Sequence, residues 1–169
     1  MSCSVLCNSL EDTDKLAKKF ADIVKDSGAF VCLLGDVGAG KTAFSKLVCK
    51  HLEVKEKVTS PSFVIINEYK SGVIPVYHFD LYRLENEGVS TIINELEEYS
   101  EGKILTLVEW AEFSQNSLPF DRIELRIDYI DDTVRNFTFT AVGDKSKELL
   151  KGLNWWLRLF LTHVLIKHI

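Results

Sequence analysis

The chain has 169 residues, of which 46% are hydrophobic and 27% charged, and its formal net charge is -5. This length fits a single domain with a real core, and the acidic balance argues against a protein that grips nucleic acid with a basic surface of its own. The four cysteines show neither CxxC nor Cys/His spacing, and the N-terminus lacks a secretion signal, so we expect a reduced, cytoplasmic protein without a sulfur-ligated metal.

One helix is expected before the first apolar strand and another after it. Ser9 followed by Asp12 is typical of a helix N-cap with an acidic first turn, and apolar residues then recur at helical spacing until Gly28. Residues 29–34 contain no charge, which predicts a central strand covered on both faces. Residues 41–52 predict a second helix with one apolar side.

The second half of the chain is expected to alternate strands with two further helices. A loop at residues 59–62 leads into a strand, and a longer strand is expected in VIPVYHFDLYRL. Residues 88–99 predict a helix, and KILTLVEW predicts another buried strand. Two stretches with alternating apolar residues, RIELRIDYI and VRNFTFTAV, predict a strand pair that adds antiparallel strands at one side of a largely parallel sheet. A final helix is expected over about residues 146–169.

The stretch between the first strand and the second helix matches GxxxxGK[ST] at every fixed position. Its glycines allow successive backbone N–H groups to turn around an anion, and a helix starting at Lys41 adds the positive end of its dipole. We therefore expect a phosphate-binding loop for ATP, with Lys41 on the phosphates and the Thr42 hydroxyl on Mg²⁺. The residues expected to contact the nucleotide here are Gly35, Asp36, Val37, Gly38, Ala39, Gly40, Lys41, Thr42 and Ala43.

Two carboxylates stand at the ends of apolar strands. Asp80 follows VIPVYHF and Glu109 follows ILTLV. A carboxylate at the carboxyl end of a parallel strand projects into the crevice where ligands bind, so either acid is a candidate to complete a metal site and polarise water. His78 is also a candidate general base, but we interpret it as a hydrogen-bonded structural residue.

In this order and spacing, GDVGAGKT, TSPSF, YHFDLYRL and LVEW resemble the TsaE (YjeE-type) family of small bacterial ATPases over about residues 9–142. The resemblance implies an α/β P-loop NTPase fold, a three-layer sandwich with a mainly parallel sheet, that spans residues 1–169 as one domain. It also implies slow, Mg²⁺-dependent ATP hydrolysis. The implied process is the threonylcarbamoyladenosine modification of tRNA, with TsaD and TsaB as partners and tRNA contacted only indirectly.

The resemblance also implies roles for single residues. Lys41 is a catalytic and phosphate-binding residue, and Thr42 and Glu109 are the metal ligands. Glu109 and Asp80 are the catalytic acids, with Asp80 close to the γ-phosphate side. The loop from Thr59 to Phe63 resembles a switch that senses the nucleotide.

Other positions matching the family are weaker guides. Thr13 and Arg135 fall where the family has residues near the adenine. Trp110 is either a packing anchor or a functional residue, and the sequence does not decide what Tyr82 contacts. Ala43 departs from the family, which usually has a hydroxyl there for the α-phosphate.

Several alternatives remain open at this stage. A small-molecule kinase would use the same loop, although residues 85–102 lack the arginines of a kinase lid. A third possibility is a nucleotide-bound interaction module without meaningful hydrolysis. The apolar tail is too short and too charged for a membrane span, and it is expected to dock on the protein's own sheet, on a partner or second copy, or at a membrane surface.

Overall fold

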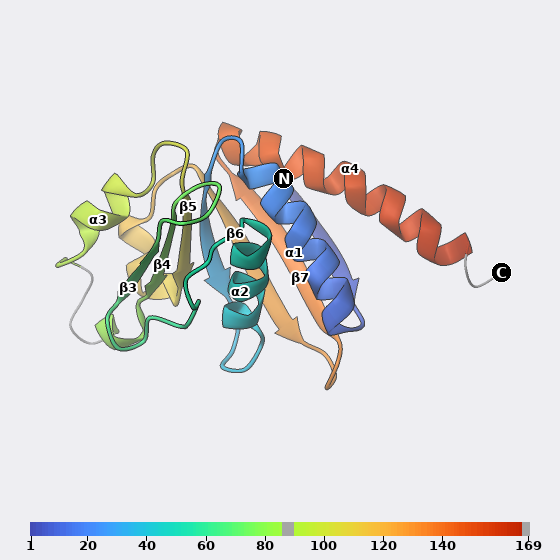
Figure 1. Ribbon diagram of the computed structural model, residues 1–169, viewed down its shortest axis with the longest axis horizontal. Helices are drawn as coiled ribbons and strands as arrows, with labels where there is room; N and C mark the ends of the chain where they lie inside the picture. Colours follow the sequence, from blue (N-terminus) through green and yellow to red (C-terminus); the bar gives the residue numbers. More distant parts are fainter. Residues whose placement is uncertain (86–89, 167–169) are drawn as a thin grey trace.

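The computed structural model describes residues 1–85 and 90–166, with only the backbone of residues 115–116 and 159–166. A mixed sheet forms the middle of the molecule, and helices pack on its faces (Figure 1). The elements in chain order are β1 Ser2–Cys7, α1 Leu10–Val24, β2 Ala29–Leu34, α2 Lys41–His51, β3 Ile66–Tyr69, β4 Val76–Asp80, the 3-10 helix Tyr82–Leu84, α3 Ile93–Glu98, β5 Leu105–Glu109, the 3-10 helix Ala111–Ser117, β6 Arg122–Tyr129, β7 Arg135–Val142 and α4 Asp144–Ile166.

The strand order across the sheet is β1-β7-β6-β2-β5-β4-β3. The four strands β6, β2, β5 and β4 are mutually parallel, whereas β7, β1 and β3 join through antiparallel pairings. This confirms the α/β class with a parallel core and antiparallel edges. The expected placement of the antiparallel strands was wrong in part, because they lie at both edges and β6 itself runs parallel to β2.

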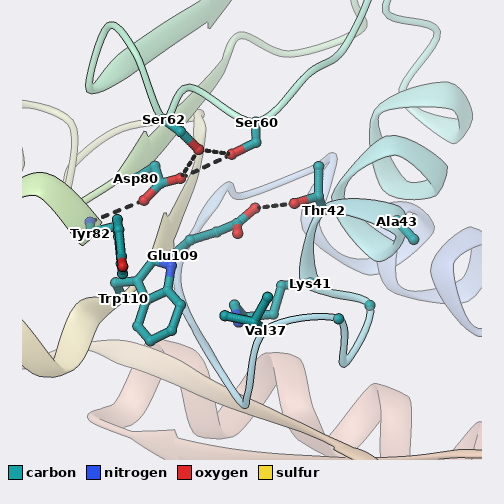
Figure 2. Close-up of a pocket in the computed structure, with 12 residues that line it drawn as sticks. Val37, Lys41, Thr42, Ala43, Ser60, Ser62, Asp80, Tyr82, Glu109 and Trp110 are labelled. Carbon is teal, nitrogen blue, oxygen red and sulfur yellow. Dashed lines mark hydrogen bonds between the residues drawn. The ribbon is translucent and has the colours of Figure 1, made fainter.

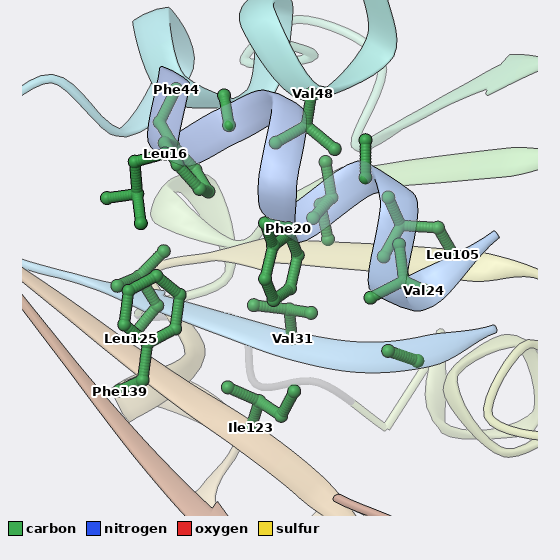
Figure 3. Close-up of a cluster of buried hydrophobic side chains, with 14 of the residues drawn as sticks. Leu16, Phe20, Val24, Val31, Phe44, Val48, Leu105, Ile123, Leu125 and Phe139 are labelled. Carbon is green, nitrogen blue, oxygen red and sulfur yellow. The ribbon is translucent and has the colours of Figure 1, made fainter. Parts of the chain in front are cut away.

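Side chains of β2 alternate between the two faces of the sheet. Val31 and Leu33 lie in the larger hydrophobic cluster, which also holds residues of α1, α2 and α4. Figure 3 shows Phe20 of α1 lying over Val31. Phe30 and Cys32 point the opposite way, into a smaller cluster with residues of α3 and the second 3-10 helix. The layers are therefore three but unequal, and an uncharged β2 is needed because both of its faces are covered.

The boundaries of several elements differ from those expected. β4 ends at Asp80 because its Oδ1 accepts a hydrogen bond of 3.0 Å from the backbone N–H of Tyr82, which turns the chain into a 3-10 helix. α3 begins only at Ile93, and residues 88–89 of the expected helix lie outside the described residues. The strand β1 was not expected at all.

The final helix packs on the protein's own body along its first half. Leu150, Leu153 and Leu157 are buried in the larger cluster, and α4 contacts β7, α1 and β1. Beyond them α4 continues past the sheet toward the C-terminus (Figure 1). Among the residues described, none of the helices combines the length and the apolar character that a transmembrane span requires.

The cysteines of the core behave as small apolar side chains, as expected. Cys32 and Cys49 are buried, and this burial raises the pKa of each thiol to about 12. Thiols of this kind remain protonated at neutral pH and are poor nucleophiles or metal ligands.

Candidate functional site

The glycine-rich loop leaves the carboxyl end of β2 and enters α2. Gly35 has φ +133°, and a Cβ there would lie 2.3 Å from the carbonyl oxygen of Ile127 on β6, so no other residue fits beside that strand. Gly40 is the left-handed N-cap of α2, and Lys41 is the first helical residue. The free N–H groups of the first turn of α2 thus lie at the rim of the loop, as anion binding requires.

The Lys41 ammonium group lies inside the loop. Its Nζ donates hydrogen bonds to the carbonyl oxygens of Gly35 and Asp36, at 2.5 and 3.0 Å, and lies 4.6 Å from the centre of the Trp110 ring. Figure 2 shows the Lys41 side chain beside Val37 and the indole. The positive charge is therefore held at the loop by weak carbonyl partners, which a phosphate oxygen can replace with a stronger, charge-assisted bond.

The two strand-end carboxylates lie side by side. β4 and β5 are parallel neighbours whose register pairs Asp80 with Glu109. Val76 of β4 lies four positions before Asp80, and Leu105 and Leu107 of β5 lie four and two positions before Glu109. All three side chains belong to the larger cluster, and alternation places both carboxylates on that same face. Both side chains are buried, at 3% and 4% exposure, and both line one cavity with the loop.

Among the described residues, hydrogen-bonding partners contact one carboxylate oxygen of Glu109. Its Oε1 accepts from the hydroxyl of Thr42 at 2.9 Å and lies 2.9 Å from Nε2 of His78. The first bond joins the second residue of α2 to the end of β5, across the floor of the cavity (Figure 2). His78 does not line the cavity, so its place fits the structural interpretation drawn from the sequence.

Asp80 connects the 59–63 loop to the sheet. Its Oδ2 accepts hydrogen bonds from the hydroxyls of Ser60 and Ser62, at 2.9 and 2.6 Å, and these two hydroxyls are also 2.8 Å apart. Figure 2 shows the pair reaching over the cavity toward Asp80. The loop that resembles a switch is thereby attached to one of the candidate catalytic acids.

The cavity has a volume of about 460 Å³ and opens to solvent. The Thr42 hydroxyl and the Glu109 carboxylate supply two hard oxygen donors at its floor, and such a pair suits Mg²⁺, which takes one or two protein ligands and completes its shell with phosphate and water. The donor set therefore fits the metal expected from the sequence. The residues that line the cavity are Val37, Gly38, Gly40, Lys41, Thr42, Ala43, Ser60, Ser62, Asp80, Tyr82, Glu109 and Trp110.

A second pocket of about 220 Å³ lies on the other side of the loop and shares Gly40 and Ala43 with the first. Thr13 and Arg135, which the family resemblance predicts near the adenine, both line it together with Ala39. The Arg135 Nε donates to the Ala39 carbonyl at 3.0 Å, and this bond fixes the guanidinium against the loop.

Two of the expected residues lie apart from these cavities, and several lining residues had not been assigned. Asp36 is exposed and lines neither pocket, and Gly35 shapes the loop from beneath it. Ser60, Tyr82 and Trp110 line the larger cavity; Ser60 belongs to the loop expected to act as a switch, whereas Tyr82 and Trp110 had no decided role in the sequence analysis. The sequence contains one signal for the place of Tyr82. It stands two residues after Asp80, and an aspartate side chain commonly accepts a hydrogen bond from the backbone N–H two residues further along the chain.

The fold and the site define the class of the molecule. It is an α/β protein in which a glycine-rich loop, the N-terminus of a helix and two strand-end carboxylates enclose one cavity at the carboxyl ends of parallel strands.

Comparison with known proteins specifies the family. The family described as "Threonylcarbamoyl adenosine biosynthesis protein TsaE" matches residues 7–137. The tRNA threonylcarbamoyladenosine biosynthesis protein TsaE of Bacillus subtilis is 41% identical over 144 residues, covering 85% of this chain and 89% of the relative. Its counterpart in Aquifex aeolicus is 38% identical over 133 residues, covering 78% and 90%.

A solved structure agrees with these sequence matches. The crystal structure of YdiB from Bacillus subtilis superposes with a TM-score of 0.75 at 35% identity, covering 91% of this chain and 95% of the other. The chain belongs to the TsaE family, and its relatives are named for tRNA threonylcarbamoyladenosine biosynthesis.

Proposed function

We propose that this protein is an ATPase that binds Mg·ATP in the larger cavity and serves tRNA threonylcarbamoyladenosine biosynthesis. The observation that carries the proposal is the 2.9 Å hydrogen bond from Thr42 to Glu109. Both residues line the same cavity as Lys41 and the glycine-rich loop. The hydrogen bond brings a phosphate-binding helix terminus and a strand-end acid to one point, which is the arrangement that nucleotide hydrolysis with Mg²⁺ needs.

In this proposal the protein places charged and hydrogen-bonding groups around the phosphates of the nucleotide. The N–H groups of the first turn of α2 and the Lys41 ammonium group bind the phosphates. Thr42 and Glu109 would hold Mg²⁺, which when bound neutralises charge on the phosphate oxygens. Asp80, beside Glu109 in the register, is a second buried acid that can orient water at the same cavity.

The smaller pocket is our candidate for the adenine side of ATP. It adjoins the larger cavity through Gly40 and Ala43, so a ligand whose phosphates occupy the first cavity can reach the second. Thr13 offers a hydroxyl there, and Arg135 offers a flat guanidinium for stacking or hydrogen bonding.

We further propose that the protein acts with TsaD and TsaB in the cytoplasm and contacts tRNA only indirectly. The formal charge of -5 supports an indirect role, because direct binding to RNA draws on a basic surface. The 59–63 loop supports a nucleotide-dependent partner contact. It is attached to Asp80 at one end of the cavity and presents Phe63, which is 84% exposed, to solvent.

The proposal is tested by reconstituting tRNA threonylcarbamoylation with TsaD and TsaB, while ATP cleavage is followed in parallel. We expect slow cleavage by the isolated protein, altered by the partners, and repeated modification turnover only in its presence. Lys41→Ala should abolish both effects, whereas Lys46→Ala, an exposed lysine of the same helix, should leave them intact. Full turnover with the Lys41 variant would contradict the proposal.

Two alternatives lead to different results in the same assays. A small-molecule kinase would yield a phosphorylated metabolite, but the described residues lining the larger cavity include no arginine to enclose a transferred phosphoryl group. A binding module without hydrolysis would keep its cellular function in a Glu109→Ala variant that still binds ATP but no longer cleaves it.

A further inference from the structure

His78 is fully buried, and the larger cavity does not reach it, yet it touches the acid at the cavity floor. It lies in the middle of β4, where Leu107 of β5 is its register partner, and its side chain points to the same face of the sheet as those of Asp80 and Glu109. Its Nε2 lies 2.9 Å from Glu109 Oε1. Burying two polar side chains costs free energy unless they form a hydrogen bond with each other. The contact between His78 and Glu109 is therefore best described as a hydrogen bond.

The hydrogen-bonding partners of the ring identify which nitrogen carries the proton. His78 Nδ1 is buried and has no hydrogen-bond partner among the described residues. Glu109 Oε1 is the acceptor of the Thr42 hydroxyl, and a carboxylate can only accept. A proton on Nε2 can be donated to Glu109 and leaves Nδ1 as a bare acceptor, whereas a proton on Nδ1 would be a buried donor without a partner among the described residues.

Glu109 is thus held from two sides. Thr42 on α2 and His78 on β4 both bind Oε1, so the carboxylate is fixed between the helix that begins at the loop and the neighbouring strand. Its other oxygen receives no hydrogen bond from the described residues. That oxygen therefore stays available at the cavity lined by Glu109.

We propose that His78 is a positioning residue, which orients the Glu109 carboxylate for Mg²⁺ through an Nε2–H···Oε1 hydrogen bond. This inference rests on the proposed Mg·ATP site. Partners that hydrogen-bond a metal-binding side chain fix its orientation, and removing them typically lowers metal affinity by about 10- to 100-fold. His78 performs this function without contacting nucleotide or metal itself.

Two amide substitutions separate positioning from packing. In His78→Gln the side-chain amide nitrogen reaches about as far as Nε2 and can still donate to Glu109. In His78→Asn the amide ends near the position of Nδ1, one methylene shorter, and cannot reach Oε1. Both variants replace the buried ring at position 78 by an uncharged amide, so a loss that comes only from removing the ring would appear in both.

The measurement is the affinity for ATP by calorimetry, with Mg²⁺ and with a chelator in its place, on the full chain. We expect His78→Asn to lower the Mg²⁺-dependent gain in affinity by about tenfold or more. Its affinity without metal should stay within about twofold of wild type, since the loop and Lys41 are untouched, and His78→Gln should retain most of the gain. Thermal unfolding of each variant establishes that it is folded.

The outcomes distinguish this inference from the function on which it rests. Wild-type protein that gains no affinity from Mg²⁺ would refute the proposed function itself. If the wild type gains affinity and His78→Asn gains as much, the positioning role is wrong. Equal losses in both amide variants, or a parallel loss of metal-free ATP binding, would show that the ring acts through packing and would also overturn the inference.

Discussion

Thr42 shows how one hydroxyl group can serve two partners at the site. Its Oγ1 donates to Glu109, whose carboxylate is nearly inaccessible to water, and its lone pairs remain free toward the cavity. A carboxylate in such a place depends on its donors, because hydrogen bonds to charged groups contribute about 1.5–3 kcal/mol. The Thr42 side chain therefore helps to hold the Glu109 carboxylate in place before any ligand binds.

Replacing Thr42 tests this arrangement at the scale of one atom. Thr42→Val keeps the shape and removes the hydroxyl, whereas Thr42→Ser keeps the hydroxyl and removes the methyl group. We expect Thr42→Val to lower Mg²⁺-dependent ATP affinity by about tenfold or more, since 1.4 kcal/mol corresponds to tenfold. Calorimetry with and without Mg²⁺ measures the change. Equal affinities in Thr42→Val and Thr42→Ser would show that the hydroxyl has no such role.

The sequence alone could predict single residues only where local context determines their position. The placement of Asp80 and Glu109 at the carboxyl ends of strands was predictable, because each ends an apolar strand and parallel strands present their carboxyl ends together. The contact between His78 and Glu109 was not, because it depends on the register of β4 against β5, which brings together residues 31 apart in the chain.

At the scale of elements, the loop between β2 and α2 depends on glycines for two different reasons. At Gly35 the obstacle is the backbone of β6, whose Ile127 carbonyl oxygen would lie 2.3 Å from a Cβ. At Gly38 none of the described residues beyond its two chain neighbours has an atom within 4 Å of that position, and only φ of +80° disfavours a side chain. The first glycine is thus required by packing in addition to its positive φ, and the second by backbone conformation alone.

These two reasons predict different costs for the same substitution. Gly38→Ala should lower the free energy of unfolding by about 1–2 kcal/mol, the penalty for a left-handed residue with a side chain. Gly35→Ala should cost clearly more, because β6 or the loop must also move. Urea denaturation of both variants measures the difference, and the idea fails if Gly35→Ala is the milder change.

Helices α1 and α2 are linked by an acid whose ionisation can be followed. Asp14 of α1 accepts from Lys50 Nζ at 3.0 Å and contacts His51 Nε2 at 3.1 Å, both from the end of α2. These hydrogen bonds, that from Lys50 first, lower the pKa of the Asp14 carboxyl below its usual range. A carboxyl with a lowered pKa in the folded state stabilises the protein above its unfolded pKa and loses this contribution as pH falls through the folded pKa.

The Asp14→Asn variant should therefore differ from wild type in a pH-dependent way. At pH 7 we expect it to be less stable by up to about 1 kcal/mol, the usual size for a partly exposed ion pair. The difference should shrink as the pH falls below the ordinary pKa of an aspartate, because the stabilisation is lost progressively down to the lowered pKa of the folded carboxyl. Urea midpoints between pH 3 and 7 test this, with Asp26→Asn, an exposed acid beyond α1, as control. A difference that is constant with pH would contradict the assignment.

β1 illustrates why some elements could not be predicted from the sequence. Its six residues lack a turn signal that would link them to a neighbouring strand, and its partner β7 lies far along the chain, with Ser2 opposite Thr140 and Cys7 opposite Arg135. Long-range pairing of this kind is decided by the assembled sheet. By contrast, α1 was predictable from local features, namely the Ser9 cap and the apolar spacing that follows it.

At the scale of the whole molecule, the unequal layers place the site. α1, α2 and α4 cover one face of the sheet around the larger hydrophobic cluster, and smaller elements cover the other. The glycine-rich loop follows β2, which lies between β5 and β6 in the sheet. The cavity therefore forms at the carboxyl end of β2, beside the carboxyl ends of its parallel neighbours. The α/β class and this location followed from the pattern of strands and the glycine motif, whereas the length of α4 that packs on the body could not be read from its apolar composition.

The packed half of α4 gives the last prediction. Leu153 is 1% exposed among residues of the larger cluster, whereas Trp155, on the same helix, is 65% exposed. We expect Leu153→Ala to lower the free energy of unfolding by about 2–5 kcal/mol, because it removes buried methyl groups and leaves a cavity. Trp155→Ala should change it by no more than about 0.5 kcal/mol. Since α4 lies away from the glycine-rich loop, both variants should bind ATP normally while folded. Similar losses of stability in the two variants, measured by urea denaturation, would show that α4 is not held by the buried face identified here.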